Sequence, residues 1–279
     1  MLNMMKADMY RLLKGKAIYI IFVFLILTSI VSAIGISPGH IGMSTSSGSA
    51  IDINDAEFVE KLSKAKSLKD VREVIKSKGS FELDKAVIGT NANLYYLFIV
   101  LVVIVLCTDF SNKSIKNTLS SAISRKKYYG SKTLLIFLLA TFFTFFNTYF
   151  FYFLNIIING KEFASSLLEV TKVTILELPL LYGIISLLIC FAFLFKKTST
   201  FNTVAIPFIL GLQLVVIGIT SLFKIKADWF YNYEFQFALE KIAQNPSTQY
   251  LIACTVLGIF YILIFHTIGY YSFKKSEIK

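Results

Sequence analysis

The sequence predicts an all-α polytopic membrane protein with six transmembrane helices, and three observations lead to this prediction. The 279 residues are 56% hydrophobic and 15% aromatic, and their mean hydropathy of +0.67 exceeds that of ordinary soluble domains. Six apolar runs are long enough to cross about 30 Å of hydrocarbon, which takes about 20 helical residues. No barrel-like alternation is visible, and backbone polar groups in lipid must be paired, so each run is expected to be helical. The predicted spans are 17–36, 92–108, 133–158, 173–195, 201–223 and 249–271.

Residues 1–16 precede the first span and are predicted to form an amphipathic interfacial helix. Basic side chains, Lys6, Arg11 and Lys14, share one side of a helical wheel. The opposite side carries apolar residues at helical spacing, namely Leu2, Met5, Met9, Leu12 and Leu13. We expect this helix to lie flat on the inner leaflet with its basic side toward anionic headgroups. An unstructured tail is the alternative.

The first span has a competing interpretation as a signal peptide. Lys14 and Lys16 precede it, and residues 31–33, Val-Ser-Ala, resemble a cleavage site. The apolar run is longer than a typical signal-peptide core, and further apolar runs follow it. A membrane anchor is therefore the prediction.

The distribution of charge predicts the orientation of the spans. The sequence has 28 Lys and Arg against 17 Asp and Glu, a net charge of +11. The excess lies in 1–16, in 109–132, at Lys196–Lys197 and in the tail 272–279, whereas the other connections are neutral. Lys and Arg near span ends favour the cytoplasmic side, so both termini and 109–132 are expected there. This topology accounts for the basic pI, and nucleic-acid binding is not expected.

Two segments are expected on the outer side. Residues 37–91 form a predicted helical insertion after a Gly- and Ser-rich exit, with apolar residues at helical spacing and caps at Asn54–Glu57 and Ser67–Asp70. Substrate recognition and a plain solvated cap both stay open for it. Residues 224–248 are an aromatic, partly embedded or re-entrant segment. Its Trp229, Tyr231 and Tyr233 are candidates for a substrate pathway, with an aromatic belt as the alternative.

Glu177 is the clear acid inside a predicted span, a few residues from its outer end. Acidic residues inside spans are functional candidates by default. Because Glu177 is shallow and Pro179 loosens the helix beside it, two interpretations stay open. The side chain either lines a pathway or is an interfacial carboxylate that reaches water.

Catalytic and metal-binding signatures are absent from the sequence. Cys107, Cys190 and Cys254 have no paired spacing. Gly15 and Lys16 lack the other residues of a phosphate loop, and no protease or hydrolase motif is found. The chain is therefore expected to be neither an enzyme nor a metalloprotein. His40 and His266 are expected to be satisfied polar residues.

Residues 109–132 are polar and basic, although they connect two strongly apolar runs. On a helical wheel Ile115, Leu119, Ala122 and Ile123 share one side, which predicts a short amphipathic helix at the membrane surface. Asp109 is expected at the inner interface, where an acid is costly unless paired. The nearest cations in sequence are Arg125, Lys126 and Lys127, so Arg125 or a neighbouring Lys is the predicted partner.

Asp109, the polar bend after it and the run SIKNTLSSAISRKKYYGSK, 114–132, resemble the first intracellular loop of permease subunits of type-2 ABC exporters. The matching loop end comprises Ile123, Ser124, Arg125, Tyr128, Ser131 and Lys132. Many members of this family have Gly-Thr where this chain has Lys113 and Ser114. The interfacial helix, the span order and the aromatic segment extend the resemblance over nearly the whole chain.

The resemblance implies that 109–132 carries a coupling helix that docks into a separate ATPase subunit. The expected coupling residues are Asp109, Ser114, Ile115, Leu119, Ile123, Ser124, Arg125, Lys126 and Tyr128. Two ATPase chains, holding ATP and Mg²⁺, and a second identical or homologous permease are the implied partners in a bacterial cell membrane. The implied activity is export of a peptide or amphipathic substrate, in antimicrobial-peptide export, immunity or resistance. The alternative function is a sensor or immunity protein that binds an antimicrobial molecule through its outer segment without transporting it.

Overall fold

The described part of the chain is helical and contains no strand, which confirms the all-α part of the predicted fold class. The computed structural model describes residues 2–35, 60–61, 64, 70, 91, 94–120, 123–161, 166–224, 228–242 and 247–276, and these contain no strand. The helices are α1 (Leu2–Lys14), α2 (Lys16–Gly35), α6 (Leu94–Val102), the π-helix η2 (Val103–Cys107), α7 (Thr108–Ser111), α8 (Ser114–Ser120), α9 (Arg125–Asn159), α10 (Leu167–Phe195), α11 (Thr198–Phe223), α12 (Asp228–Tyr233), α13 (Phe235–Ile242) and α14 (Thr248–Lys275). The helices predicted within 37–91, with their caps and His40, lie outside the described residues apart from isolated positions.

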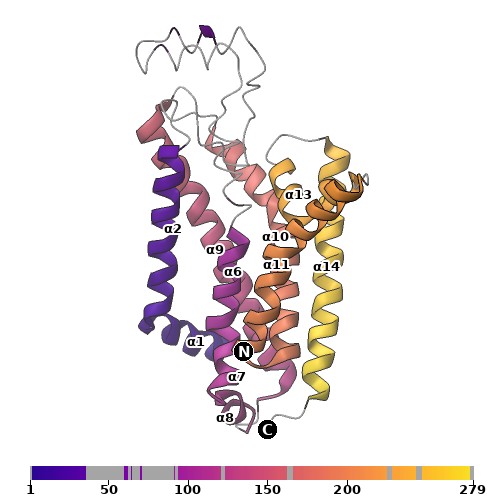
Figure 1. Ribbon diagram of the computed structural model, residues 1–279. Helices are drawn as coiled ribbons and strands as arrows, with labels where there is room; N and C mark the ends of the chain where they lie inside the picture. The colour runs from indigo at the N-terminus through magenta and orange to yellow at the C-terminus, as the bar shows by residue number, and fades with distance from the viewer. Residues whose placement is uncertain are drawn as a thin grey trace.

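Among the described residues, four helices are long and apolar enough to cross a membrane: α9, α10, α11 and α14. Two bent pairs, α1 with α2 and the 96–111 stretch with α8, raise the number to six if each pair is counted as one span. The bends measure 67° and 74°. Several apolar helices suited to a multi-pass membrane protein are therefore present. In Figure 1 the long helices run side by side, with α1 and α8 at one end and α13 at the other.

The two elbows follow from the residues at them. At the first, the Gly15 amide donates to the carbonyls of Arg11 and Leu12, and the Tyr19 hydroxyl donates to the Leu13 carbonyl at 2.9 Å. At the second, Lys113 has a φ of 56° in the turn between α7 and α8. The helices on either side of each elbow therefore point in different directions, and both elbows lie at the α8 end.

Two helices begin earlier than the predicted spans, because polar caps precede the apolar runs. α9 starts at Arg125, where the Ser124 side chain accepts from the Lys127 amide, so 125–132 is helix and not loop. α10 starts at Leu167 behind a capping box of Ser166 and Glu169. Such caps satisfy amides that a helix start leaves unpaired. The first turns of both helices thus extend beyond the apolar part of the sequence.

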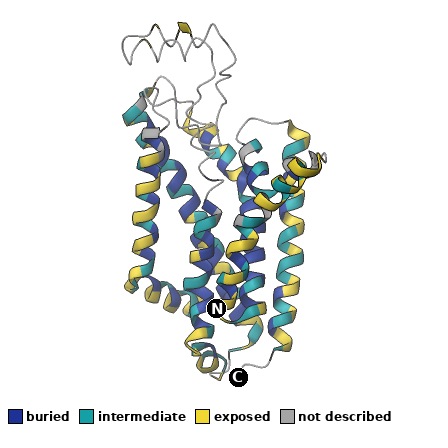
Figure 2. Cartoon of the chain, in the orientation of Figure 1, coloured by how far each residue is buried: buried dark blue, intermediate teal, exposed yellow. Residues whose placement is uncertain are grey.

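Helix α10 occupies the centre of the bundle. Most of its residues from Leu180 to Phe193 are buried, whereas α2, α11 and α14 present many apolar side chains outward. Figure 2 shows this contrast as a dark interior with lighter outer helices. Outward apolar faces are expected where lipid is the solvent.

Helices α10 and α14 approach so closely that their backbones touch. A Cβ placed on Gly258 would lie 2.5 Å from the carbonyl carbon and oxygen of Pro179 and 2.9 Å from the Leu180 amide nitrogen. A Cβ on Gly269 would lie 3.2 Å from the Cα of Cys190. Small residues that let helix backbones approach are typical of membrane helix packing.

We predict that Gly258→Ala destabilises the protein strongly, because the new methyl group meets backbone atoms that cannot rotate away. The expected loss is about 1–3 kcal/mol of unfolding free energy, as for overpacking in a tight core. Gly218→Ala is the matched control, since a Cβ on Gly218 meets nothing within 4 Å. Replacing a helical Gly by Ala there should be neutral or stabilising. The midpoint of unfolding of the purified variants in one detergent measures both, and an equal response of the two variants would contradict the prediction.

Candidate functional site

Four charged side chains meet at the α8 end of the bundle and form a charge cluster: Asp8, Asp109 and Lys132, which are buried, and Arg11, whose side chain is 46% exposed. An Arg11 nitrogen, Nη1, lies 2.6 Å from Asp109 Oδ1, and Lys132 Nζ lies 2.6 Å from Asp109 Oδ2. Lys132 Nζ also lies 2.8 Å from Asp8 Oδ1, and Arg11 Nη2 lies 3.4 Å from the same oxygen. Two acids thus face two cations, so the cluster is neutral as a whole.

Lys132 is the centre of this cluster. Lys132 is only 2% exposed. Its ammonium group contacts the carboxylates of Asp8 and Asp109, and it also donates to the Val105 carbonyl at 3.4 Å. Val105 belongs to η2, where the wider π-helical turn changes the ordinary backbone pairing. An ammonium group has three N–H donors, and here each has an acceptor. Lys132 therefore joins α1, α9 and the η2–α7 segment.

Further hydrogen bonds fix Asp109 within the cluster. The Tyr128 hydroxyl donates to Asp109 Oδ2 at 2.9 Å, and Tyr128 is fully buried. The Ser114 hydroxyl donates to the Asp109 carbonyl at 3.3 Å, from the first residue of α8. Asp109 is therefore connected to α1, α8 and α9 together.

The predicted partner of Asp109 is Arg125 or a neighbouring Lys. Arg125 is not that partner, because Asp109 pairs with Lys132, at the end of the same segment, and with Arg11. The Arg125 guanidinium instead donates through Nη1 to the carbonyls of Phe273, Lys274 and Ser276, at 3.0, 2.7 and 2.7 Å. These carbonyls belong to the carboxyl end of α14, which lacks intrahelical donors and attracts a cation. Arg125 thus connects the start of α9 to the end of α14. Arg11 and Lys132 neutralise Asp109.

Arg11 has a partner that the sequence alone does not predict. The amphipathic helix α1 forms, with Leu12 buried and Leu2 and Leu13 exposed by 70% and 50%. The Arg11 side chain is 46% exposed, and its guanidinium binds the Asp109 carboxylate on the bundle side. The basic side of α1 is therefore only partly available for headgroups.

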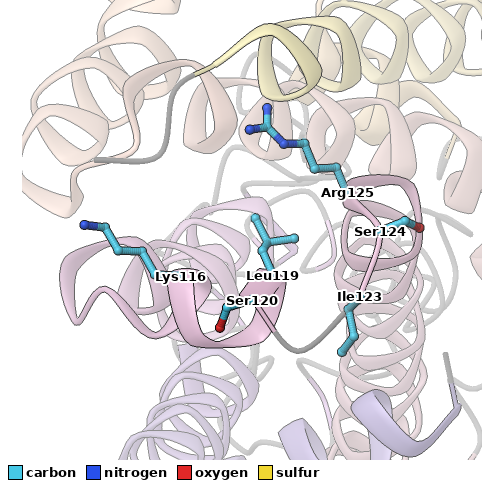
Figure 3. Close-up of a pocket in the computed structure, with 6 residues that line it drawn as sticks. All are labelled: Lys116, Leu119, Ser120, Ile123, Ser124 and Arg125. Atoms are coloured by element: carbon cyan, nitrogen blue, oxygen red, sulfur yellow. The ribbon is translucent and has the colours of Figure 1, made fainter.

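A groove lies at the same end of the bundle as the charge cluster, between α8 and the start of α9. Its volume is about 580 Å³, and Figure 3 shows the side chains that line it. Lys116, Leu119 and Ser120 come from α8, and Ser124 and Arg125 flank the first turn of α9, with Ile123 between the two helices. We call it the α8 groove. It combines two aliphatic side chains with two cations and two hydroxyls.

The structure separates the nine predicted coupling residues into two groups. Leu119, Ile123, Ser124 and Arg125 line the α8 groove, and Lys126 is exposed next to it. Asp109, Ile115 and Tyr128 are buried and Ser114 is half-buried. Asp109, Ile115 and Tyr128 are inaccessible to a partner in this arrangement, and Ser114 connects α8 to the Asp109 carbonyl.

A second polar centre surrounds Glu177 near the other end of the bundle. Glu177 is fully buried, and its Oε2 accepts from Asn91 Nδ2 at 2.8 Å. The same Asn91 nitrogen donates to the Thr148 hydroxyl at 2.9 Å, and the Asn91 oxygen accepts from Asn147 at 3.1 Å. Glu177 is thus enclosed by neutral polar side chains, and the interpretation as a carboxylate that reaches water is wrong. The reason is that α9 and Asn91 cover this face of α10.

The aromatic segment forms two short helices, α12 and α13. Trp229 and Tyr231 lie in α12, and Tyr233, at its end, is 40% exposed and stacks on Tyr250 at 5.8 Å between ring centroids. Glu234 sits between the helices and accepts from the first amides of α13. Burial raises the pKa of Glu234, although those amides act in the opposite direction. The three aromatic residues predicted to line a pathway, Trp229, Tyr231 and Tyr233, all belong to α12, and Glu177 belongs to α10.

His266 is a satisfied polar residue, as predicted. Its ring nitrogens lie 2.9 Å from the Tyr129 hydroxyl and 3.2 Å from the Ser186 hydroxyl. The three cysteines are free and buried, and the described residues contain no cluster of His, Cys, Asp and Glu suited to a metal ion.

We predict that Asp109 is energetically coupled to Lys132 and not to Arg125. Lys132→Met leaves two buried carboxylates with one cation, which should cost about 3–5 kcal/mol of unfolding free energy. In a double-mutant cycle, Asp109→Asn and Lys132→Met should show a coupling of about 1–3 kcal/mol. The control cycle, Asp109→Asn with Arg125→Gln, should be additive within about 0.5 kcal/mol. Denaturant unfolding in mixed micelles measures both, and a larger coupling to Arg125 would refute this assignment of partners.

No family model matches this chain, and neither a curated protein nor a solved structure shows a match to it. The charge cluster, the α8 groove, the Glu177 centre and the sequence resemblance of residues 109–132 are therefore the basis for a functional proposal.

Proposed function

We propose that the chain is the membrane-spanning permease subunit of an ATP-driven exporter of the type-2 ABC class. The observation that carries the proposal is the α8 groove, an amphipathic surface braced from within by the charge cluster. In this proposal the groove receives a separate ATPase subunit, which supplies ATP and Mg²⁺. The resemblance of residues 114–132 to the coupling segment of such permeases supports the same conclusion.

The chemistry of the groove indicates what kind of partner surface would fit. Leu119 and Ile123 supply apolar contact area, and Lys116 and Arg125 add positive charge at the rim. A complementary partner would insert an apolar projection and present acidic or carbonyl oxygens around it. The excess of Lys and Arg at this end supports a cytoplasmic location, where ATP is available.

The charge cluster offers a physical route from a docked partner to the bundle. α8 follows α7 through a 74° bend, and Asp109 in α7 is bonded to side chains of α1 and α9. Breaking a buried ion pair is costly, so these three elements should move together when α8 is displaced. A shift of this kind becomes transport only if the bundle has two discrete arrangements.

The proposal includes a second permease chain, identical or homologous, and two ATPase chains. The cargo class, a peptide or an amphipathic molecule, follows from the resemblance alone. The amphipathic helix α1 and the aromatic α12–α13 segment fit a protein that handles molecules at membrane surfaces. One scaffold can export many cargoes, so the site supports the class and no single compound.

We predict that Leu119→Asp and Ile123→Asp each abolish association with the proposed ATPase subunit. A carboxylate in the apolar floor of the interface would be desolvated without a partner, and a loss of about 3 kcal/mol lowers affinity by about a hundredfold. Asn117→Asp is the matched control, because it adds the same charge to α8 outside the groove lining. Co-purification from detergent-solubilised membranes, with the permease quantified by its own tag, measures the effect. Full ATPase recovery with both groove variants would rule out the α8 groove as the docking site.

A further inference from the structure

The Glu177 centre shares no residue with the α8 groove, and the proposed coupling to an ATPase assigns it no role. Six side chains with oxygen atoms come together there, each no more than 4% exposed: Ser29, Asn91, Asn147, Thr148, Thr174 and Glu177. They come from α2, from the position before α6, from α9 and from α10. Besides the contacts described above, the Thr174 hydroxyl donates to Thr148 Oγ1 at 3.4 Å, and the Ser29 hydroxyl donates to Asn147 Oδ1 at 3.4 Å.

The carboxylate in this centre has an unsatisfied oxygen. Glu177 Oε1 is buried and has no hydrogen-bond partner among the described residues. Buried polar atoms almost always have a partner, and a carboxylate oxygen without one is costly in a medium of low dielectric constant. Oε1 therefore marks a position where a positively polarised ligand would be stabilised.

Among the described residues, no Lys or Arg side chain contacts Glu177 Oε1. The only charged residue of α2 is Lys16 at its first position, and those of α9 end at Lys132, both at the α8 end. On α10 the other charged residues, Glu169 and Lys172, lie nearer the helix start and are exposed. The side chains with printed hydrogen bonds to Glu177, Asn91 and Thr148 among the described residues are neutral. The centre thus holds one potential negative charge and several neutral oxygens.

We propose that the Glu177 centre binds one monovalent metal cation, of the sodium or potassium type. Oxygen ligands without His or Cys favour hard cations. A single carboxylate balances one positive charge, whereas divalent ions are usually held by more than one acid. Glu177 is the anionic ligand, and the hydroxyls of Thr148 and Thr174 complete the site. The Asn91 nitrogen donates to Glu177 Oε2 and the Asn91 oxygen accepts from Asn147, so this amide positions the carboxylate and leaves Oε1 for the ion.

The ion would add a charged contact between segments that otherwise meet through apolar packing and neutral hydrogen bonds. Glu177 lies about 15 Å along α10 from its first residue, Leu167, at a rise of 1.5 Å per residue. The site is therefore nearer the α13 end, and an ion could enter from that side. Once bound, it would hold α9, α10 and the chain before α6 together.

Thermal unfolding of the full-length purified protein tests this proposal. The unfolding midpoint is measured in NaCl, KCl and choline chloride at one ionic strength. For the wild type, we expect one alkali cation to raise the midpoint by several degrees over choline, saturating between about 1 and 100 mM, because a ligand that binds only the folded state stabilises it. Glu177→Gln should abolish this rise, and Thr174→Val should shift the half-saturating concentration upward by about tenfold. Thr171→Val is the control, since its hydroxyl bonds the Leu167 carbonyl and lies near Tyr149, outside the centre.

Three outcomes overturn the proposal. The first is an equal response of the wild type to both alkali cations and to choline, and the second is an unchanged cation response in Glu177→Gln. The third is a midpoint that depends on pH but not on the alkali cation, with the dependence lost in Glu177→Gln, because a proton then occupies the site. If Glu177→Gln does not fold, Thr174→Val and Thr148→Val decide the matter through ²²Na⁺ or ⁸⁶Rb⁺ binding to detergent-purified protein, and unchanged affinity in both refutes the site.

Discussion

The contact between Lys132 and Asp109 is the interaction on which the α8 end of the molecule depends. It brings together a helix that starts at Arg125, a segment that ends at Ser111 and, through Asp8, the first helix of the chain. A buried ion pair of this kind adds little net stability compared with apolar side chains of the same size. Removing one member, however, leaves a charge without compensation. The cluster therefore specifies one arrangement of α1, α7 and α9 more than it strengthens the fold, and the α8 groove inherits its position from that arrangement.

The charge cluster and the Glu177 centre differ in what surrounds their buried carboxylates. At the α8 end, each carboxylate has a cation from another helix within 3.4 Å, so the charges cancel inside the protein. Around Glu177 the described neighbours offer only dipoles of amides and hydroxyls. In the first centre the charges balance within the chain, although Asp8 Oδ2 has no hydrogen-bond partner among the described residues. The second has the composition of a site that needs something from outside the chain.

Local patterns in the sequence predicted much of the fold but little of the polar chemistry. Apolar periodicity identifies the long helices and α8, and the starts of α9 and α10 could have been read from Ser124 and from Ser166 with Glu169. The partners of Asp109 lie 98 and 23 residues away, at Arg11 and Lys132, and no local pattern encodes which cation a fold delivers. The burial of Glu177 depends on Asn91, which is 86 residues away. Its one sequence signal was a set of polar residues, Asn147 and Thr148 among them, inside an apolar run.

The contact of Gly258 with the Pro179 carbonyl constrains how the bundle can rearrange. Where two backbones touch, no side chains stand between them that could switch rotamers and accommodate sliding. α10 and α14 should therefore behave as one rigid body, and relative displacement is left to the segments around it. The elbows at Gly15 and Lys113 are natural pivots for such displacement, since both interrupt helices beside the charge cluster. In mechanical terms, the pair α10–α14 would be the stationary frame, and α1, α2, α7 and α8 the moving parts.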